Sequence, residues 1–571
     1  MTRLIVVLIT FAVFFQNVLA QEITELKKAQ DLLNTKGEVH LVFDANSKYE
    51  VSILSGYMSI DKVVGNRIFA YLSKQQFEYF QKLNYSYKVL ETQDNSKAVT
   101  MATTIEQMGT WNRYPTHDVY MEMMNKFAAT YPTLCKMQSI GRSVDGRDLL
   151  VLKISDNVQD DEAEPEVFYT ATMHGDELLG YILMLRLADS LLKGYNPLAK
   201  TNYLVDNFEI YINPLANPDG TYSSGNSTIS YPTRYNSNSE DLNRDFFNFN
   251  TATEVFSEKS TVQPETKAMI NFAKAHNFVL SANIHGGIEV VNFPWDVWTE
   301  GAYDYHPHPD NKWFSRVSRA YATSAQQNSP AGYIDDLDNG ITCGADWYYA
   351  YGTRQDYMNY FRHCREITLE LHNTKELSAS LLPAYWKYNK NSLINYIKEA
   401  AFGINGFVTD TQGNPLSAKV EILQHDLDNS YVTTEPTNGD YYRPIESGVY
   451  DLKFSAEGYK DKIVEGVTAV NGQATRLDVE LEKVQSSIVS NLESVRFYPN
   501  PIDDFLIIET LNSDIQISDI QVFDIFSRRI PLVFVRHENV FKLNTTNLSK
   551  GNYFCKIIYA QQTETIQFVK L

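Results

Sequence analysis

Cysteine is scarce in this chain, which limits what can hold the fold together. Only 4 of the 571 residues are cysteine, too few for a disulfide-dense scaffold. None belongs to a Cys-x-x-Cys pair, which argues against a cysteine-ligated metal site. Cys343 and Cys364 flank a segment that carries candidate site residues. Either they form a disulfide in an oxidising compartment or they remain buried free thiols.

The chain also lacks an excess of basic residues and long apolar runs. Its 50 Lys and Arg residues against 70 Asp and Glu residues give a formal net charge of -20. This charge excludes nucleic acid as an expected partner, because phosphates would be repelled. Beyond the first 20 residues no apolar run is long enough to cross a bilayer. The length predicts several domains, each with its own core.

The first 20 residues are typical of a secretory signal peptide. Arg3 precedes the apolar run from Leu4 to Phe15, and Val18-Leu19-Ala20 follows at the cleavage positions. A membrane anchor is the alternative, but the run is shorter than the roughly 20 residues that a span needs. We therefore expect residues 1–20 to be removed on export.

Residues 21–104 are predicted to form a small α/β domain. Its position between the signal peptide and the region with candidate catalytic residues suggests a propeptide. A polar stretch, residues 91–98, would connect the two. The patterns of alternating and amphipathic residues predict strands at 40–43, 67–72 and 87–90 and a helix at 74–83.

The rest of the chain divides into three regions by their predicted secondary structure. Residues 105–402 alternate strand-like and helix-like segments, which predicts an α/β domain with a parallel or mixed sheet. Residues 403–483 have short strands between turn signals, which is typical of a small β-sandwich. A polar linker at 484–491 precedes a last β-rich module, again expected to be a β-sandwich, at 492–571.

Two histidines and a glutamate form a candidate metal site. His174 and Glu177 are three residues apart, and His285 follows 108 residues after Glu177 at the end of a predicted buried strand. Two imidazoles and a carboxylate are the ligands of catalytic zinc, which keeps one position open for water. Alone, a His-x-x-Glu pattern is weak evidence, because such histidines are commonly just packed in a core.

Other polar residues fit a hydrolytic site. Glu370 ends an apolar strand, where burial would raise its pKa and suit it to act as a general base. A solvent-facing glutamate at a strand edge is the alternative. Arg234, Asn243 and Arg244 supply cations and a donor for an oxyanion or a carboxylate. The alternative for either arginine is a solvated surface charge, which is the commoner case for arginines in general.

Several motifs in the correct order resemble the zinc carboxypeptidases, specifically their carboxypeptidase N/E branch. The resemblance runs from about residue 111 to 482. The motifs include Thr172-Met173-His174-Gly175-Asp176-Glu177, Asn217-Pro218-Asp219-Gly220, Asp241-Leu242-Asn243-Arg244, Gly340-Ile341-Thr342 and Glu366-Ile367-Thr368-Leu369-Glu370-Leu371.

The resemblance implies a role for each matching residue. His174, Glu177 and His285 match the ligands of one zinc ion per catalytic domain, and Glu370 matches the general base. The arginine that stabilises the oxyanion corresponds to Arg234. The residues that hold the terminal carboxylate of a substrate and close over it correspond to Asn243, Arg244 and Tyr348.

The resemblance also implies a preference for the C-terminal residue of the substrate. Asp296 matches the acid that favours a C-terminal Lys or Arg, and Gln355 matches its pocket companion. The sequence departs from the branch at Arg354, where methionine is usual. If Arg354 points into the pocket, its charge weakens the basic preference.

The flanking modules extend the resemblance. Gly406-Phe407-Val408 and Gly413-Asn414-Pro415 resemble the transthyretin-like domain of this branch. The last module, with Phe497-Tyr498-Pro499-Asn500-Pro501 at its start, resembles the C-terminal sorting domain of the Bacteroidetes type IX secretion system. It implies a bacterial protein that the secretion machinery releases or attaches to the cell surface.

We therefore expect an exported, monomeric zinc metallocarboxypeptidase that acts on peptide and protein C-termini and prefers those ending in Lys or Arg. Two alternatives remain open. One is a peptidoglycan-peptide hydrolase on the same scaffold, and the other is an inactive surface module that only binds peptides.

Overall fold

The computed structural model describes residues 22–90, 99–196, 202–248, 262–298, 305–484, 495–510, 517–526, 528–537, 539–559 and 562–570. The expected signal peptide, the polar connection at 91–98 and all but the first residue of the 484–491 linker lie outside these residues. The chain forms two compact units, residues 1–483 and 484–571, which are described separately.

An N-terminal domain occupies residues 22–90. After a helix at 22–36, an antiparallel sheet of order β2-β3-β1-β4 packs against two further helices. The elements are β1 (Glu38–Asp44), α2 (Lys48–Ser55), β2 (Ser59–Val64), β3 (Arg67–Ser73), α3 (Lys74–Lys82) and β4 (Tyr87–Val89). The strands and the helix expected here are present within a residue or two of their predicted ends.

The hairpin of β2 and β3 carries residues that contact the central domain. Val64 pairs with Arg67, so Gly65 and Asn66 form a two-residue turn, with Gly65 at φ +62°. Pairing with β3 shifts register between Ile60 and Lys62. Such a bulge re-aims the side chain of the extra residue, here Asp61.

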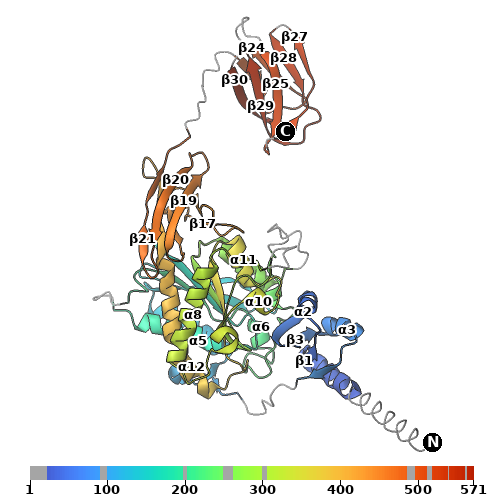
Figure 1. Ribbon diagram of the computed structural model, residues 1–571, viewed down its shortest axis with the longest axis vertical. Helices are drawn as coiled ribbons and strands as arrows, with labels where there is room; N and C mark the ends of the chain where they lie inside the picture. The colour runs from blue at the N-terminus through green and yellow to red at the C-terminus, as the bar shows by residue number, and fades with distance from the viewer. Residues whose placement is uncertain are drawn as a thin grey trace, which may run out of the picture. The chain divides into compact units, whose positions relative to one another are not determined.

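The central domain contains a mixed eight-stranded sheet of order β13-β12-β14-β11-β9-β10-β8-β7. Figure 1 shows this domain, with helices in front of the strands. The four central strands β14, β11, β9 and β10 run parallel to one another, and β12 and β8 run antiparallel to them. The strands are β7 (Cys135–Arg142), β8 (Asp148–Ile154), β9 (Glu166–Ala171), β10 (Glu209–Asn213), β11 (Leu280–His285), β12 (Glu289–Phe293), β13 (Ile341–Cys343) and β14 (Arg365–Leu371). The α/β fold with a mixed sheet is as predicted.

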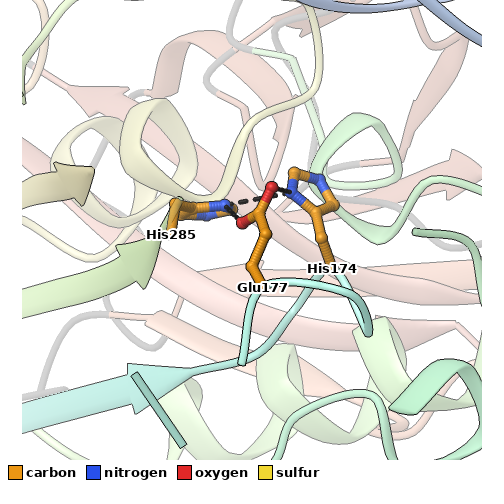
Figure 2. A group of neighbouring side chains, drawn as sticks. All are labelled: His174, Glu177 and His285. Carbon is orange, nitrogen blue, oxygen red and sulfur yellow. Dashed lines mark hydrogen bonds and ion pairs between the residues drawn. The ribbon is translucent and has the colours of Figure 1, made fainter. Parts of the chain in front are cut away.

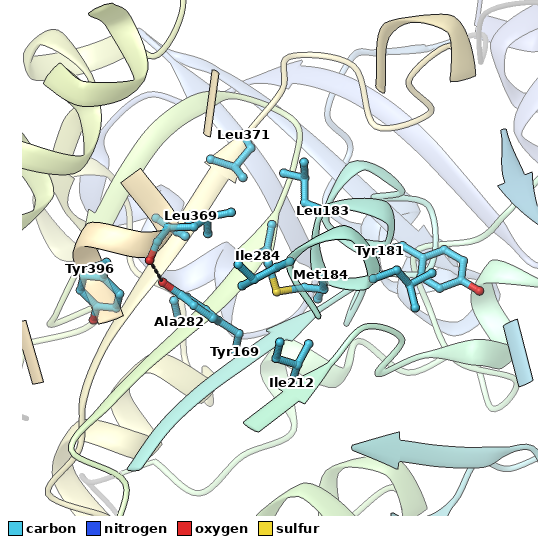
Figure 3. Close-up of a cluster of buried hydrophobic side chains, with 14 of the residues drawn as sticks. Tyr169, Tyr181, Leu183, Met184, Ile212, Ala282, Ile284, Leu369, Leu371 and Tyr396 are labelled. Carbon is cyan, nitrogen blue, oxygen red and sulfur yellow. Dashed lines mark hydrogen bonds between the residues drawn. The ribbon is translucent and has the colours of Figure 1, made fainter. Parts of the chain in front are cut away.

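Alternating side chains of this sheet enter two different cores. Val167 and Tyr169 of β9 belong to the larger core, whereas Phe168 belongs to the smaller one, as the two-residue period of a strand requires. The larger core lies under α4 (His117–Thr130), α5 (Leu179–Lys193), α8 (Asn311–Gln327) and α12 (Leu382–Lys398). Figure 3 shows part of it, where the Tyr169 hydroxyl donates to the Leu393 carbonyl at 2.8 Å. The smaller core lies under α7 (Pro264–Lys274) and α11 (Arg354–Phe361).

Residues 403–483 form two four-stranded sheets around one core. One contains β15 (Gly403–Asp410), β18 (Asp440–Arg443), β21 (Ala474–Arg476) and β22 (Val479–Leu481). The other contains β16 (Ala418–Ile422), β17 (Val432–Thr433), β19 (Gly448–Ala456) and β20 (Lys462–Ala469). A buried ion network ties them to the central domain, because Arg443 donates to Asp310 and Asp426.

The second unit also has two four-stranded sheets and its own core. Their strands are β23 (Val495–Tyr498), β24 (Phe505–Thr510), β25 (Ile517–Asp524), β26 (Arg529–Ile530), β27 (Phe534–His537), β28 (Val540–Asn544), β29 (Gly551–Tyr559) and β30 (Gln562–Lys570). Among the described residues of both units, no helix combines the length and apolarity that a bilayer crossing requires.

Candidate metal centre and substrate cleft

The loop after β9 carries two of the predicted ligands. The strand ends at Ala171, and Thr172 turns the chain at φ +62°. A Cβ on Gly175 would lie 2.4 Å from the backbone of Gly220, so only glycine fits this close approach. The loop thereby holds His174 and Glu177 at the carboxyl edge of the sheet, where α/β folds bind their ligands.

His174, Glu177 and His285 converge, as Figure 2 shows. The Glu177 carboxylate lies 2.9 Å from Nδ1 of His174 and 2.8 Å from Nδ1 of His285, and the two nitrogens are 3.0 Å apart. All three side chains are buried. Zinc holds such atoms at about 2.0–2.2 Å, which places them roughly 3–3.5 Å from one another, so the donor set and its spacing fit one zinc ion.

The outer nitrogens of both rings have polar partners. Nε2 of His174 lies 3.1 Å from Oδ1 of Asp241, and Nε2 of His285 lies 2.7 Å from the amide of Asn283. A carboxylate such as that of Asp241 accepts the outer N–H of a ligating imidazole and fixes its orientation. These contacts leave the two Nδ1 atoms facing Glu177.

The charge states suit metal binding. Burial is the main reason that the pKa of His285 falls to about 4, so its ring is neutral. Burial would raise the pKa of Glu177, but its interactions with His174, Lys375 and His285 hold it well below its usual range. A neutral imidazole and an ionised carboxylate are the forms that bind a metal.

Glu370 lies beside this cluster because of strand register. In the parallel pair β11–β14, His285 is opposite Glu370. Burial and the charge of Glu177 raise the pKa of Glu370 well above its usual value. Its buried Oε2 atom has no hydrogen-bond partner among the described residues, which leaves one acceptor unsatisfied.

Arg234 is buried at the same centre. Its Nη2 lies 3.0 Å from Oδ2 of Asp241, and its Nη1 lies 3.1 Å from Nδ1 of His174 and 3.4 Å from Glu177. The neighbouring Asp241 thus contacts both His174 and Arg234, and it fixes the cation beside the cluster.

The residues expected to hold a terminal carboxylate contact one another and the N-terminal domain. Arg244 donates through Nη1 to the Asn243 carbonyl at 2.8 Å and through Nη2 to the Ile60 carbonyl at 2.9 Å. The hydroxyl of Tyr348 lies 3.3 Å from the same Ile60 oxygen. The amide oxygen of Asn243 accepts from the backbone N–H of Arg354 at 2.9 Å.

Asp296 is buried beside two amide side chains. Its Oδ1 accepts from Nδ2 of Asn292 at 2.8 Å and from Nε2 of Gln355 at 2.9 Å. A Cβ on Gly344 would lie 2.1 Å from Asp296 Oδ1, so this approach also needs glycine. The remaining amide oxygens of Asn292 and Gln355 have no hydrogen-bond partner among the described residues.

The Arg354 side chain does not contact Asp296. Its guanidinium is fully buried, forms an ion pair with Glu366 at 3.0 Å and donates to Thr170 and Ser281 at 2.7 and 3.0 Å. The charge that the sequence placed near Asp296 is therefore balanced by Glu366. Cys343 and Cys364 are buried free thiols, so the disulfide that the sequence left open is not formed.

The sequence interpretation missed two contributors to the cleft. Lys375 lies 2.9 Å from Glu177 and 2.7 Å from Asp61, and no pattern around it signals this position. Strand β2, which carries Asp61, was also missed. The dipeptide Gly65-Asn66 between two apolar runs is a hairpin signal that would have indicated it.

Comparison with known proteins matches three parts of the chain. Residues 120–392 match the zinc carboxypeptidase family, 403–482 a carboxypeptidase regulatory-like domain and 496–570 a secretion system C-terminal sorting domain. The carboxypeptidase N catalytic chain of Rattus norvegicus is 33% identical over 413 residues, which are 66% of this chain and 89% of that protein. The chain belongs to the zinc carboxypeptidase family.

Other relatives in the family are longer. Carboxypeptidase D of Mus musculus is 36% identical over 394 residues, which are 67% of this chain but 28% of that protein. A solved carboxypeptidase A from Helicoverpa armigera aligns with a TM-score of 0.48 and 16% identity over 63% of this chain and 98% of that one. The sorting domain of this carboxypeptidase family member indicates export to the medium or the cell surface.

Proposed function

We propose that this exported chain is a zinc metallocarboxypeptidase that removes single residues from peptide and protein C-termini, preferably Lys or Arg. The observation that carries the proposal is the convergence of His174, Glu177 and His285 next to Glu370. Every residue of the expected site is present, which disfavours an inactive binding module.

The chemistry divides among a few groups. Zinc bound to the three ligands would lower the pKa of a bound water to about 7 and polarise the scissile carbonyl. Oε2 of Glu370 accepts the proton of the attacking water. Its raised pKa lets it retain that proton and pass it to the leaving amine nitrogen. The buried Arg234 guanidinium stabilises the oxygen that gains negative charge.

Recognition of a free carboxylate makes the enzyme an exopeptidase. Arg244 and the Tyr348 hydroxyl converge on one acceptor oxygen, that of Ile60. The same two donors, with the Asn243 side chain, would hold the terminal carboxylate of a substrate, because a guanidinium matches a carboxylate in shape and charge.

The preference for basic residues rests on the Asp296 pocket. One carboxylate and two unpartnered amide oxygens, those of Asn292 and Gln355, surround it. A guanidinium offers five N–H donors and an ammonium three, and neither accepts. An apolar side chain would leave these acceptors buried and unsatisfied, and such a loss discriminates strongly. The pocket thus also disfavours the peptidoglycan-peptide alternative.

A peptide series tests the proposal. For the assay, residues 91–98 are replaced by a protease cleavage site, and activity is measured before and after cleavage. The cut is needed because the N-terminal domain contacts Arg244 and Tyr348. Peptides differ only in the last residue: Arg, Lys, Leu or D-Ala. We expect single-residue release from the Arg and Lys peptides, and none after Glu370→Gln although zinc content is unchanged. Full activity of Glu370→Gln would refute the assignment.

A further inference from the structure

A pocket of about 490 Å³ lies between the central domain and the regulatory-like domain, residues 403–482. The central domain contributes residues 274–277, at the end of α7, and residues 361–363, at the end of α11. The regulatory-like domain contributes residues 417–419, at the start of β16, and residues 433–436. Small-molecule sites often lie at domain interfaces and have volumes in this range. None of these residues takes part in the proposed hydrolysis.

Three cations from different elements line this pocket. Lys274 is the last residue of α7, Arg362 follows α11, and Lys419 lies on β16. They come from separate segments of a chain whose net charge is -20. Their convergence is therefore a feature of the fold and does not follow from a basic composition.

One wall of the pocket is a neutral histidine with positive charge around it. Burial lowers the pKa of His363 to about 4, and nearby positive charges, including those of Arg362 and Lys419, contribute to the fall. The centre of the His363 ring lies 4.1 Å from that of the Tyr431 ring, and Nζ of Lys419 also lies 4.1 Å from the centre of Tyr431. The Tyr431 ring therefore holds Lys419 close to His363, at the wall of the pocket.

The acidic groups near the pocket oppose these cations only in part. Among the described residues that line it, one is an acid, Glu435, and burial raises its pKa, which favours the neutral form. Glu166 lies 2.6 Å from Nδ1 of His276 and is engaged by that ring. Glu421 pairs with Lys419 at 3.2 Å, but the two side chains are 28% and 36% exposed, so water screens the pair. The cations therefore outnumber the carboxylates that line the pocket.

We propose that this pocket binds a ligand that carries a phosphate or sulfate group, and that the ligand contacts both domains at once. A tetrahedral oxyanion has several acceptor oxygens, so it can accept from cations that approach from different sides. An arginine fork matches such an anion in shape and charge, and a lysine binds it as a point charge. Phe361, Ala418 and Pro436 add apolar surface to the pocket. An ester of the oxyanion with a sugar or a similar carrier therefore fits better than the free ion.

The test measures binding to the full, zinc-loaded chain by isothermal titration calorimetry at low and at physiological salt. The probes are inorganic phosphate, inorganic sulfate, glucose 6-phosphate and, as the neutral counterpart, glucose. The variants are Arg362→Gln and Lys419→Gln, each of which removes one positive charge from the pocket. Lys460→Gln is the matched control, because Lys460 belongs to the same regulatory-like domain, has a side chain that is 60% exposed and does not line the pocket. Circular dichroism checks that each variant is folded.

We expect glucose 6-phosphate to bind saturably, with a Kd that rises with salt, and glucose not to bind. Arg362→Gln and Lys419→Gln should each weaken binding about tenfold, because each removes a hydrogen bond to a charged group. Lys460→Gln should leave the affinity unchanged. The ligand should also raise the unfolding temperature of the wild type more than that of Arg362→Gln, because it binds only the folded chain.

The comparison of probes distinguishes the two sources of the anion. Tighter binding of glucose 6-phosphate than of inorganic phosphate or sulfate would assign the pocket to an ester, and equal binding would assign it to the free ion. The same affinity in the wild type, Arg362→Gln and Lys419→Gln would overturn the inference, because the anion would then bind elsewhere, for instance at the metal centre. The absence of saturable binding of all three charged probes would overturn it as well.

Discussion

Replacing Asp296 by asparagine should change which C-terminal residue is removed. The substitution keeps the oxygen that accepts from Asn292 and Gln355 at 2.8 and 2.9 Å, so the pocket retains its shape. It removes the negative charge and adds an N–H₂ group that faces the donors of a basic substrate. The effect on specificity therefore isolates the electrostatic contribution.

The magnitude can be worked from the hydrogen bonds that are lost. A hydrogen bond to a charged group contributes about 1.5–3 kcal/mol, and about 1.4 kcal/mol corresponds to a factor of ten. We expect kcat/KM for an Arg-ending peptide to fall by about 10- to 150-fold. The value for the matching Leu-ending peptide should stay constant or rise.

Asp356→Asn provides the matched control. Burial and the charge of Asp296 raise the pKa of Asp356 well above its usual value, which favours the neutral form that asparagine imitates. It accepts the backbone N–H of Asp296 at 2.9 Å through an oxygen that asparagine also has. The ratio of Arg to Leu cleavage should then be unchanged. If Asp296→Asn left this ratio unchanged as well, the pocket assignment would be wrong.

Three further predictions concern charge and stability. Arg354→Met leaves Glu366 buried without its partner at 3.0 Å, and breaking a buried pair costs about 3–5 kcal/mol. Thermal unfolding should show this loss of stability, and the double variant Arg354→Met with Glu366→Gln should recover most of it. A changed ratio of Arg to Leu cleavage would contradict the observed orientation of Arg354. Burial lowers the pKa of His308 to about 3, so between roughly pH 6.5 and 3 this histidine binds a proton only in the unfolded chain. The free energy of unfolding should therefore fall as the pH drops through this window. Denaturant titrations of His308→Asn should show a shallower fall, and an unchanged fall would contradict the role of His308. Lowering the pH should also reduce cleavage of Arg-ending peptides more than Leu-ending ones, because burial raises the pKa of Asp296 and its protonation removes the attracting charge; parallel pH profiles for the two peptides would argue against this.

Part of this site could be predicted from the sequence because it follows local patterns. The apolar run before His285 predicts a buried strand that ends at a polar residue, and β11 ends at His285. The His-x-x-Glu spacing similarly places His174 and Glu177 on one loop. These features depend on a few neighbouring residues and on the two-residue period of strands.

Other features depend on residues far apart in the chain. The pairing of His285 with Glu370 requires β11 and β14 to be neighbours in register, which no local pattern specifies. From the sequence alone, the Arg354 side chain could point toward Asp296 or into the core. In the structure it points into the core, because it forms an ion pair with Glu366 of β14. The contact of Asp61 with Arg234 joins two domains across more than 170 residues.

The most direct test of the central claim compares one Arg-ending peptide with its C-terminal amide, both incubated with the cut, zinc-loaded chain and measured by mass spectrometry. We expect release of a single arginine from the free acid and negligible cleavage of the amide, because the proposed contacts of Arg244 and Tyr348 require a terminal carboxylate on the substrate. Equal cleavage of the amide, or cleavage at internal bonds, would contradict the claim.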